Sequence, residues 1–533
     1  MTDAVADIAK AYSFDGPALE LGALVVETTA HPEAAVRIPL SMLNRHGLVA
    51  GATGTGKTKT LQLMAEQLSD AGVPCVLADI KGDVSGLAAP GLPSDRVSSR
   101  AKEVGVDWVP RGYPVEFLSI GGVGTGTALR ASITSFGPQL LAKVMSMNDV
   151  QASSLGLIFH YADKAGLPLL DLKDLRAVIQ WLTSDEGETE LKDLGGLSRS
   201  TAGVILRDLI ALEDQGANQF FGEPELDTAD LMRTTPDGKG VLNILELQGL
   251  QDRPKLFSTF LMWLVADLFH DLPEVGDVDK PKLVFFFDEA HLLFDDASEA
   301  FLQSVAQTVR LIRSKGIGIF FVTQTPKDVH PDVLAQLGNR IQHALRAFTP
   351  DDAKKLKATV STFPKSATYD LEQLLTQLGI GEAVVTILSE RGTPTPVAWT
   401  RMRPPTSLMA QADPTLQETL VHASPLYAKY NTAIDRDSAY EMLAAKHAAP
   451  GPVPGQVPAP IPGEIPTTPP LSPPPVPEPP PQASHEGLLD KLGGFFNSPM
   501  GKSMSRSLGT AVGREISRGV FGTAPRRRTR RRY

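Results

Sequence analysis

A glycine-rich segment, Gly51-Ala52-Thr53-Gly54-Thr55-Gly56-Lys57-Thr58, constrains the fold of this chain more than any other feature. It has the pattern G-x-x-x-x-G-K-[ST], in which glycines let successive backbone N–H groups turn inward around phosphate oxygens. An apolar segment, 46–50, precedes it. After it, apolar residues recur at the spacing of one helix face, at Leu61, Met64, Ala65 and Leu68. The pattern predicts a strand, a phosphate-binding loop, and a helix whose positive end faces the phosphates.

In a loop of this kind the lysine, here Lys57, reaches the β- and γ-phosphates of a nucleotide, and the hydroxyl of Thr58 binds Mg²⁺. ATP and Mg²⁺ are therefore the expected cofactors. The sequence has no Asn-Lys-x-Asp motif that would specify guanine, and this favours ATP over GTP. The nucleotide-binding residues expected from the motif are Gly51, Ala52, Thr53, Gly54, Thr55, Gly56, Lys57, Thr58 and Lys59.

A second apolar segment, Leu283–Phe287, ends in two acids, Asp288 and Glu289. Next to a phosphate-binding loop, Asp288 at the end of a strand is placed to hold Mg²⁺, directly or through water. Glu289 is placed to polarise an attacking water molecule. The simpler alternative is a solvated strand end without a chemical role. The pair indicates an enzyme that hydrolyses nucleoside triphosphates.

A third apolar segment, Ile317–Val322, ends in Thr323 and Gln324. A polar side chain at this place would contact the γ-phosphate or the attacking water. The simpler alternative is a polar cap on the end of a strand. We predict Gln324 as a sensor residue of the site.

Arg310 and Arg313 precede this third segment and, being three residues apart, share one face of a helix. An arginine supplied across a subunit boundary stabilises the charge of phosphoryl transfer and makes hydrolysis depend on assembly. The alternative is a solvated basic helix end, which the helix dipole favours. The sequence does not show which of the two would act. The expected catalytic residues are Lys57, Glu289, Gln324, Arg310 and Arg313.

Most of the strand-like segments are continuous in apolar residues rather than alternating, which is typical of a parallel sheet covered on both faces. They lie at 48–50, 75–80, 115–120, 241–245, 283–287, 317–322, 341–348 and 382–388. We therefore expect an α/β fold with a mostly parallel central sheet. The expected parts are a short N-terminal β segment (1–45), the first part of the ATPase core (46–129), a mostly helical insertion (130–233), the second part of the core (234–448), a Pro-rich linker (449–482) and a basic, partly helical tail (483–533).

Charge is distributed unevenly along the chain. The net charge is −10, but residues 483–533 contain eleven Lys and Arg against three Asp and Glu, so that the remaining residues carry about −18. An acidic body is not typical of a general nucleic-acid binder. Any contact with DNA would need a local basic surface or the tail.

Composition and the first residues also indicate where in the cell the protein is located. Cys75 is the single cysteine, which excludes an internal disulfide framework and fits a reducing environment. No apolar run approaches the roughly 18 residues of a membrane-spanning helix. The first seven residues contain acids and no basic region of a secretory signal. We expect a cytoplasmic protein.

The last 84 residues have a composition of their own. Sixteen of the 32 residues 450–481 are prolines, which is typical of an extended linker. Six of the seven residues 526–532 are arginines. Such a run can bind phosphates, anionic lipid or an acidic protein surface, and it is equally typical of a solvated segment without a specific ligand.

These motifs, in this order, resemble the HerA/FtsK superfamily of ring-forming P-loop ATPases, and most closely the bacterial helicase HerA-like C-terminal domain family. The resemblance rests on Arg37–Leu40, His46–Gly51, Asp79–Asp83, Met147–Gln151, Asp288–His291, Val322–Gln324 and Gly381–Ala383. It implies a RecA-like fold and a homo-oligomeric, hexameric ring. It also implies that Asp79 is the second-strand acid of the nucleotide site. Archaeal HerA proteins carry an N-terminal β-barrel, for which the roughly 45 residues before the loop are too few.

Three functions are consistent with this sequence. The first is an ATP-hydrolysing ring motor of HerA/FtsK type that moves DNA or another polymer through its pore, with double-stranded DNA as one possible partner. The second is an ATP-dependent assembly switch or scaffold that recruits a protein partner through the Pro-rich linker. The third is a membrane-surface ATPase whose Arg-rich tail binds an anionic surface.

Overall fold

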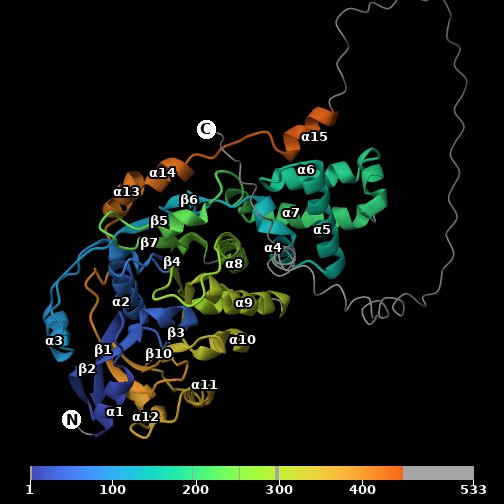
Figure 1. The fold of residues 1–533 in the computed structure, drawn as a ribbon. Helices are drawn as coiled ribbons and strands as arrows, with labels where there is room; N and C mark the ends of the chain where they lie inside the picture. The colour runs from blue at the N-terminus through green and yellow to red at the C-terminus, as the bar shows by residue number, and fades with distance from the viewer. Residues whose placement is uncertain (1–2, 195, 251–252, 295–298, 390, 448–533) are drawn as a thin grey trace, which may run out of the picture. The chain divides into compact units, whose positions relative to one another are not determined.

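The apolar segments of the sequence assemble into one sheet in the computed structural model, which describes residues 3–194, 196–250, 253–294, 299–389 and 391–447 (Figure 1). In this described part the sheet has twelve strands, in the order β2-β1-β12-β11-β10-β3-β9-β8-β4-β7-β5-β6. The strands are β1 (Ala18–Val26), β2 (Thr29–Pro39), β3 (Gly47–Ala50), β4 (Cys75–Asp79), β5 (Val115–Ile120), β6 (Thr127–Leu129), β7 (Leu242–Glu246), β8 (Leu283–Phe287), β9 (Ile317–Thr323), β10 (Asn339–His343), β11 (Glu382–Thr386) and β12 (Ala398–Met402).

Helices connect these strands and cover the sheet (Figure 1). They are α1 (Asp3–Ala11), α2 (Lys57–Asp70), α3 (Asp95–Glu103), α4 (Ile133–Val144), α5 (Asp149–Ala165), α6 (Leu172–Leu182), α7 (Arg199–Asp214), α8 (Pro254–Asp271), α9 (Glu299–Ile312), α10 (Pro331–Leu334), α11 (Pro350–Val360), α12 (Leu371–Gln377), α13 (Pro414–Ala423), α14 (Pro425–Tyr430) and α15 (Ala439–His447). Helices α4 to α7 pack against one another in a group of their own (Figure 1), inside the segment for which a helical insertion was expected.

The sheet is parallel through its centre and antiparallel at one side. From β10 to β6 all neighbouring strands are parallel. The strands β11, β12, β1 and β2 continue the sheet with antiparallel pairs. This confirms the α/β fold with a mostly parallel central sheet.

Both faces of the central strands are buried, which explains why their sequences are continuous in apolar residues. Phe285 and Phe287 point into the core that contains α4 to α9, whereas Phe286 lies in the second core with α2. Aromatic rings also pack across strands, since the rings of Phe287 and Phe321 stack with centroids 5.5 Å apart. Each of these four phenylalanines is at most 2% exposed.

The strand predicted at 341–348 differs from the structure at its end. Strand β10 begins at Asn339 and stops at His343. There the carbonyl of Ala344 accepts a hydrogen bond from the N–H of Ala52 in the glycine-rich loop (2.8 Å). The chain then turns away, and Phe348 is 83% exposed. A contact with a loop distant in sequence therefore ends a strand that the apolar pattern would have continued.

The segments 449–482 and 483–533, expected as linker and tail, lie outside the described residues. Every helix among the described residues is too short or too polar to span a bilayer.

A buried carboxylate ties α2, the helix after the glycine-rich loop, to the segment that follows β12. Glu66 on α2 is 2% exposed. Its Oε2 accepts hydrogen bonds from the N–H and the hydroxyl of Thr406 (both 2.9 Å), and its Oε1 accepts from the N–H and the hydroxyl of Ser407. Burial raises the pKa of Glu66, and these hydrogen bonds oppose that shift. The segment at 406–407 thus fixes the helix on which Lys57 and Thr58 lie.

We predict that Glu66→Ala lowers the free energy of unfolding by about 2–3 kcal/mol, because it leaves buried donors at Thr406 and Ser407 without an acceptor. Denaturant unfolding measured by circular dichroism checks this. Glu418→Ala on the exposed face of α13 is the matched control, with an expected change within about 0.5 kcal/mol. Equal stability of the two variants would show that the carboxylate does not anchor the helix.

Candidate nucleotide-binding site

Four neighbouring parallel strands end at one edge of the sheet and carry most of the residues selected from the sequence. In sheet order they are β3, β9, β8 and β4. The glycine-rich loop follows β3, Gln324 follows β9, Asp288 and Glu289 follow β8, and Asp79 ends β4. Because the strands are parallel, these residues share the edge at which open α/β sheets bind ligands.

The glycine-rich loop is packed closely against β10. Gly51 has a φ of 156°, and a Cβ atom there would lie 2.5 Å from the Cβ of His343. The side chain of Lys57 lies inside the loop, where Nζ donates to the carbonyls of Gly51 (2.7 Å) and Ala52 (3.3 Å). Burial lowers the pKa of Lys57, while the charge of Glu289 acts in the opposite direction. This ammonium can exchange the two carbonyls for phosphate oxygens, which form stronger, charge-assisted hydrogen bonds.

Oxygen atoms that could hold a cation gather beside Thr58. The Thr58 hydroxyl donates to Oδ2 of Asp83 (3.1 Å). Oδ1 of Asp83 and Oδ2 of Asp288 are buried and have no hydrogen-bond partner among the described residues. The pKa of Asp288 is raised to about 7, first by burial and then by the charges of Glu289 and Asp83.

This set of oxygens fits Mg²⁺, which is held by one or two carboxylates together with nucleotide phosphates and water. The residues that would hold it are the two selected from the sequence, Thr58 and Asp288, with Asp83 beside them. In the described ranges no cluster of three or more His, Cys, Asp or Glu side chains could hold a metal ion by itself. Phosphate oxygens and water would therefore complete the coordination.

Asp79 shapes the loop after β4. Its Oδ1 accepts from the backbone N–H groups of Lys81 (3.2 Å) and Gly82 (2.7 Å), and its Oδ2 accepts from that of Val84 (3.2 Å). It is 1% exposed, and burial raises its pKa to about 6. The structure thus places Asp79 as a cap for the segment 81–84, and its direct contact with the nucleotide stays a prediction.

Glu289 forms an ion pair that the sequence analysis did not foresee. Its Oε1 accepts a hydrogen bond from Nζ of Lys81, from the loop after β4. The side chain of Glu289 is 6% exposed and that of Lys81 is 46% exposed. Burial lowers the pKa of Lys81, but the hydrogen bond and charge of Glu289, with the charges of Asp288 and Asp83, more than offset this, so that the pKa is raised. Lys81 and Asp83 belong to Asp79–Asp83, one of the segments that carry the family resemblance. Their contacts with Glu289 and Thr58 could not be predicted from that segment alone, because both partners come from distant parts of the chain.

Gln324 lies at the same edge, whereas Thr323 has a structural role. The Thr323 hydroxyl is buried and donates to Oδ2 of Asp328 (2.8 Å). Gln324 is exposed and lines a cleft of about 550 Å³ together with His291, two residues beyond Glu289. Of the two polar residues that follow the apolar run, Gln324 is the one with an exposed side chain, and its contact with a bound ligand stays a prediction.

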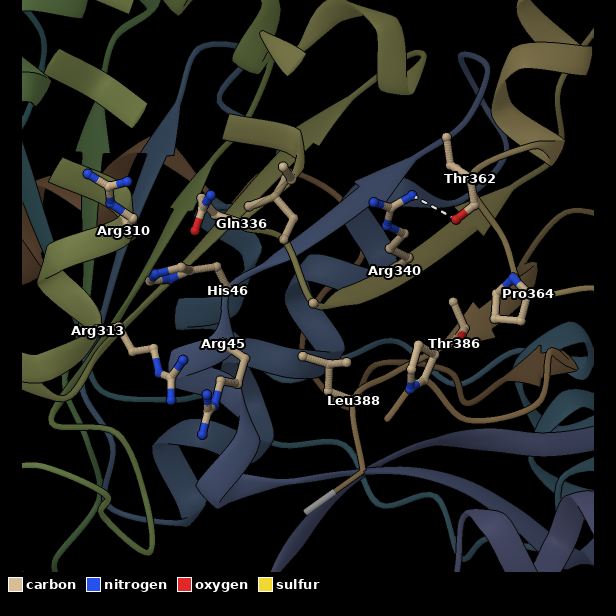
Figure 2. Close-up of a pocket in the computed structure, with 14 residues that line it drawn as sticks. Arg45, His46, Arg310, Arg313, Gln336, Arg340, Thr362, Pro364, Thr386 and Leu388 are labelled. Atoms are coloured by element: carbon tan, nitrogen blue, oxygen red, sulfur yellow. Dashed lines mark hydrogen bonds between the residues drawn. The ribbon is translucent and has the colours of Figure 1, made fainter. Parts of the chain in front are cut away.

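Arg310 and Arg313 lie at the opposite edge of the sheet. They line a pocket of about 400 Å³ with Arg45 and His46, which precede β3, and with Arg340 near the start of β10 (Figure 2). Arg340 donates to the carbonyl of Thr362 (3.1 Å), as the dashed line in Figure 2 shows. The seven residues of β9, about 23 Å at ~3.3 Å per residue, separate this pocket from Gln324. These arginines therefore do not reach the phosphate-binding loop of their own chain.

We predict that Asp288→Asn raises the free energy of unfolding by about 1–3 kcal/mol at pH 8 without nucleotide or Mg²⁺. The pKa of Asp288 is about 7 in the folded protein against an ordinary value of 3.8. Between these two values the unfolded chain loses its proton first, so the wild type becomes less stable as the pH rises, whereas asparagine cannot ionise.

Most of the gain should vanish near pH 4, because Asp288 stays protonated in the folded state there and the unfolded chain, with its ordinary pKa of 3.8, has only begun to lose the proton. Denaturant unfolding at the two pH values measures it, with Asp107→Asn at an exposed position as the control. A variant that is no more stable than the wild type at pH 8 would contradict the assignment of a destabilising buried charge.

Comparison with known proteins shows the family to which this chain belongs and the fold it shares. The sequence model of the family "Helicase HerA-like C-terminal" matches residues 25–530. The "DNA double-strand break repair helicase HerA" of Saccharolobus solfataricus is 20% identical over 377 residues, which cover 70% of this chain and 67% of the relative. The "Probable helicase MJECL08" of Methanocaldococcus jannaschii is 29% identical over 154 residues. That match spans 27% of this chain and 28% of the relative, so the chain covers less than a third of the latter's length.

Solved structures share the fold. The plasmid coupling protein TrwB in complex with ADP and Mg²⁺ aligns with a TM-score of 0.50 at 16% identity, over 77% of this chain and 94% of that one. Its complex with the non-hydrolysable ATP analogue ADPNP aligns with a TM-score of 0.50 at 15% identity over the same shares. The fold is thus that of the RecA-like P-loop ATPases, as the sequence predicted. Because the family model spans most of the sequence, the chain belongs to the helicase HerA-like C-terminal family.

Proposed function

We propose that this protein is an ATP-hydrolysing ring motor and that double-stranded DNA is the polymer it moves. One observation carries the ATPase part of the proposal. The ends of β3, β9, β8 and β4 bring a lysine-containing phosphate loop, a pair of acids and an exposed glutamine to one edge of the sheet. That set holds a triphosphate at one end and a water molecule at the other.

Each residue has a role in this reaction. Lys57 and the backbone of 51–58 bind the phosphates, with Lys59 beside them. Thr58 and Asp288 would hold Mg²⁺, which neutralises charge on the phosphate oxygens when it is bound. Glu289 polarises the water whose oxygen bonds to the γ-phosphorus, while the bond from that phosphorus to the bridging oxygen breaks. The products are ADP and inorganic phosphate, and Gln324 contacts the γ-phosphate or the water.

The position of Arg310 and Arg313 supports a multi-subunit enzyme. They line a pocket at the edge opposite the phosphate-binding loop, so that a catalytic role requires the nucleotide of another subunit. In a head-to-tail ring each interface places one edge of a subunit against the other edge of its neighbour. We propose a homo-oligomeric ring of six subunits in which one of the two arginines acts across the boundary.

The DNA part of the proposal rests on the relatives. Proteins described as DNA repair helicases match about two thirds of this chain. The body of the chain is acidic, so DNA must meet a local surface rather than a general positive field.

A second candidate function is an ATP-dependent switch or scaffold. It is favoured by the sixteen prolines at 450–481 and the six arginines at 526–532, which could recruit a protein partner or an anionic surface. ATP hydrolysis belongs to both functions, and only the motor requires DNA.

The proposal predicts steady-state ATP hydrolysis that disappears in Lys57→Ala and falls at least about 100-fold in Glu289→Gln. Glu289→Gln should still bind ATP, because it leaves the phosphate-binding loop intact, and fluorescent-nucleotide binding measures this. Normal turnover in either variant would overturn the assignment of the site.

The same assay with double-stranded DNA at about 50 and 200 mM salt separates the two functions. A DNA motor should be stimulated several-fold at the lower salt and much less at the higher one, because phosphate contacts weaken as salt rises. Hydrolysis that depends on Lys57 but ignores DNA at both salts would exclude the motor and leave the switch.

We further predict that Arg310→Ala or Arg313→Ala abolishes hydrolysis without loss of ATP binding, and that mixing with Lys57→Ala protein restores part of it. In mixed rings a Lys57→Ala subunit supplies its arginine to a neighbour whose own loop is intact. When the two variants are mixed in equal amounts and assemble at random, about a quarter of the interfaces pair an intact arginine with an intact phosphate-binding loop.

Arg199→Ala is the control, because this arginine is 64% exposed on α7 and pairs with Asp185. It should hydrolyse ATP at the wild-type rate. Mixtures that remain inactive, although their subunits exchange, would show that the arginines do not act across a boundary.

A further inference from the structure

Lys81 joins the loop after β4 to the acid that polarises water in the proposed reaction. Its Nζ forms an ion pair with Oε1 of Glu289, across the neighbouring strands β4 and β8. Oε2 of Glu289 is buried and has no hydrogen-bond partner within the described residues, although Nδ1 of His291 lies 3.2 Å away. One oxygen of the carboxylate is therefore held by a cation, and the other is available to a new donor.

The loop that carries Lys81 is held in place from both sides. The Asp79 carboxylate accepts hydrogen bonds from the backbone at residues 81, 82 and 84. The carbonyl of Lys81 accepts from Nε2 of Gln411 (3.2 Å). Gly82 has a φ of 77°, and a Cβ atom there would lie 1.7 Å from Nε2 of Gln248. The fixed backbone limits where the side chain of Lys81 can go, and the ion pair with Glu289 places its ammonium.

Glu289 itself depends on a partner for its orientation. It has a left-handed backbone, with φ 47° and ψ 48°, and its N–H donates to Oδ1 of Asp288 (2.9 Å). The neighbouring carboxyl group of Asp288 interacts unfavourably with the carboxylate of Glu289. Of the other groups that could pair with it, His291 lies beside Oε2, with Nδ1 3.2 Å away, and Lys57 is the residue proposed to bind phosphate. Lys81 is therefore the cation left to hold Oε1 once ATP is bound.

We propose that Lys81 is a positioning residue for ATP hydrolysis, which holds Oε1 of Glu289 so that Oε2 accepts a hydrogen bond from the attacking water. This inference rests on the proposed ATPase function. A base that is oriented by a third group is a recurring arrangement in catalysis, and removal of such a group lowers activity by about 10–100-fold. Lys81 acts through Glu289 and not by contact with the phosphates.

The test compares Lys81→Met, Lys81→Arg and wild type in steady-state ATP hydrolysis. For Lys81→Met we expect kcat to fall about 10–100-fold, while KM and the Kd for ATP stay within about 2-fold. Lys81→Arg should recover a large part of the rate, because a guanidinium also donates to a carboxylate. The control is Lys354→Met, whose ion pair with Asp351 lies on the surface of α11 with both side chains more than 75% exposed. It should behave as wild type.

A double variant separates positioning from other roles. In the Glu289→Gln background, single-turnover measurements should show no further loss on adding Lys81→Met, because the residue through which Lys81 acts is already changed. An additional 10-fold loss in that background would overturn the proposal, since Lys81 would then act independently of Glu289.

Three other results would also overturn it. A weaker Kd for ATP in Lys81→Met, as in Lys57→Ala, would place the lysine on the phosphates. A kcat above that of wild type would make the ion pair inhibitory. An unchanged kcat in a variant with the wild-type melting temperature would leave the pair without a role. A wild-type protein without Lys57-dependent hydrolysis would instead reject the proposed ATPase function, so that the two failures are distinguishable.

Discussion

The site depends on a balance of charge at the ends of two adjacent parallel strands, β4 and β8. Buried or half-buried carboxylates crowd this edge, and their mutual repulsion raises the pKa of Asp288 further than burial alone would. The opposing positive charges come from Lys57 inside the phosphate loop and Lys81 beside Glu289. Binding of a nucleotide with Mg²⁺ would change both the positive and the negative charges at this edge, because the phosphates would pair with Lys57 and the cation would pair with carboxylates. The ion pair between Lys81 and Glu289 is the contact that can remain when the nucleotide binds.

The parallel strands that create this balance also separate the site from the arginines. Strand β9 carries Gln324 at its carboxyl end, and the segment before its amino end holds Arg310 and Arg313. The two ends of β9 lie a whole strand length apart, so a single bound nucleotide cannot contact residues at both ends of the same strand. In the proposed reaction, the arginines and the phosphate-binding site can therefore meet only between subunits. Assembly and hydrolysis would thus be linked by the direction of the strands.

The sequence alone predicted the parts of the site that a single strand end determines. The apolar run 283–287 predicts β8 with both boundaries correct, because its side chains are buried on both faces and its end is marked by acids. The strand before the glycine-rich segment and the helix after it were also predicted, because the local spacing of apolar residues marks both. The pairing of Lys81 with Glu289 was not predictable, since it depends on β4 lying next to β8, 208 residues apart. The end of β10 was also missed, because a contact between Ala344 and Ala52, and not local pattern, ends that strand.

The segment after β12 connects stability to the site. Thr406 and Ser407 hold Glu66 on α2, while Gln411 holds the carbonyl of Lys81. One short stretch of chain therefore contacts both the helix that positions the phosphate loop and the loop that positions Glu289. The antiparallel strands carry none of the proposed catalytic residues, yet the segment that follows the last of them in the chain contacts both parts of the proposed site.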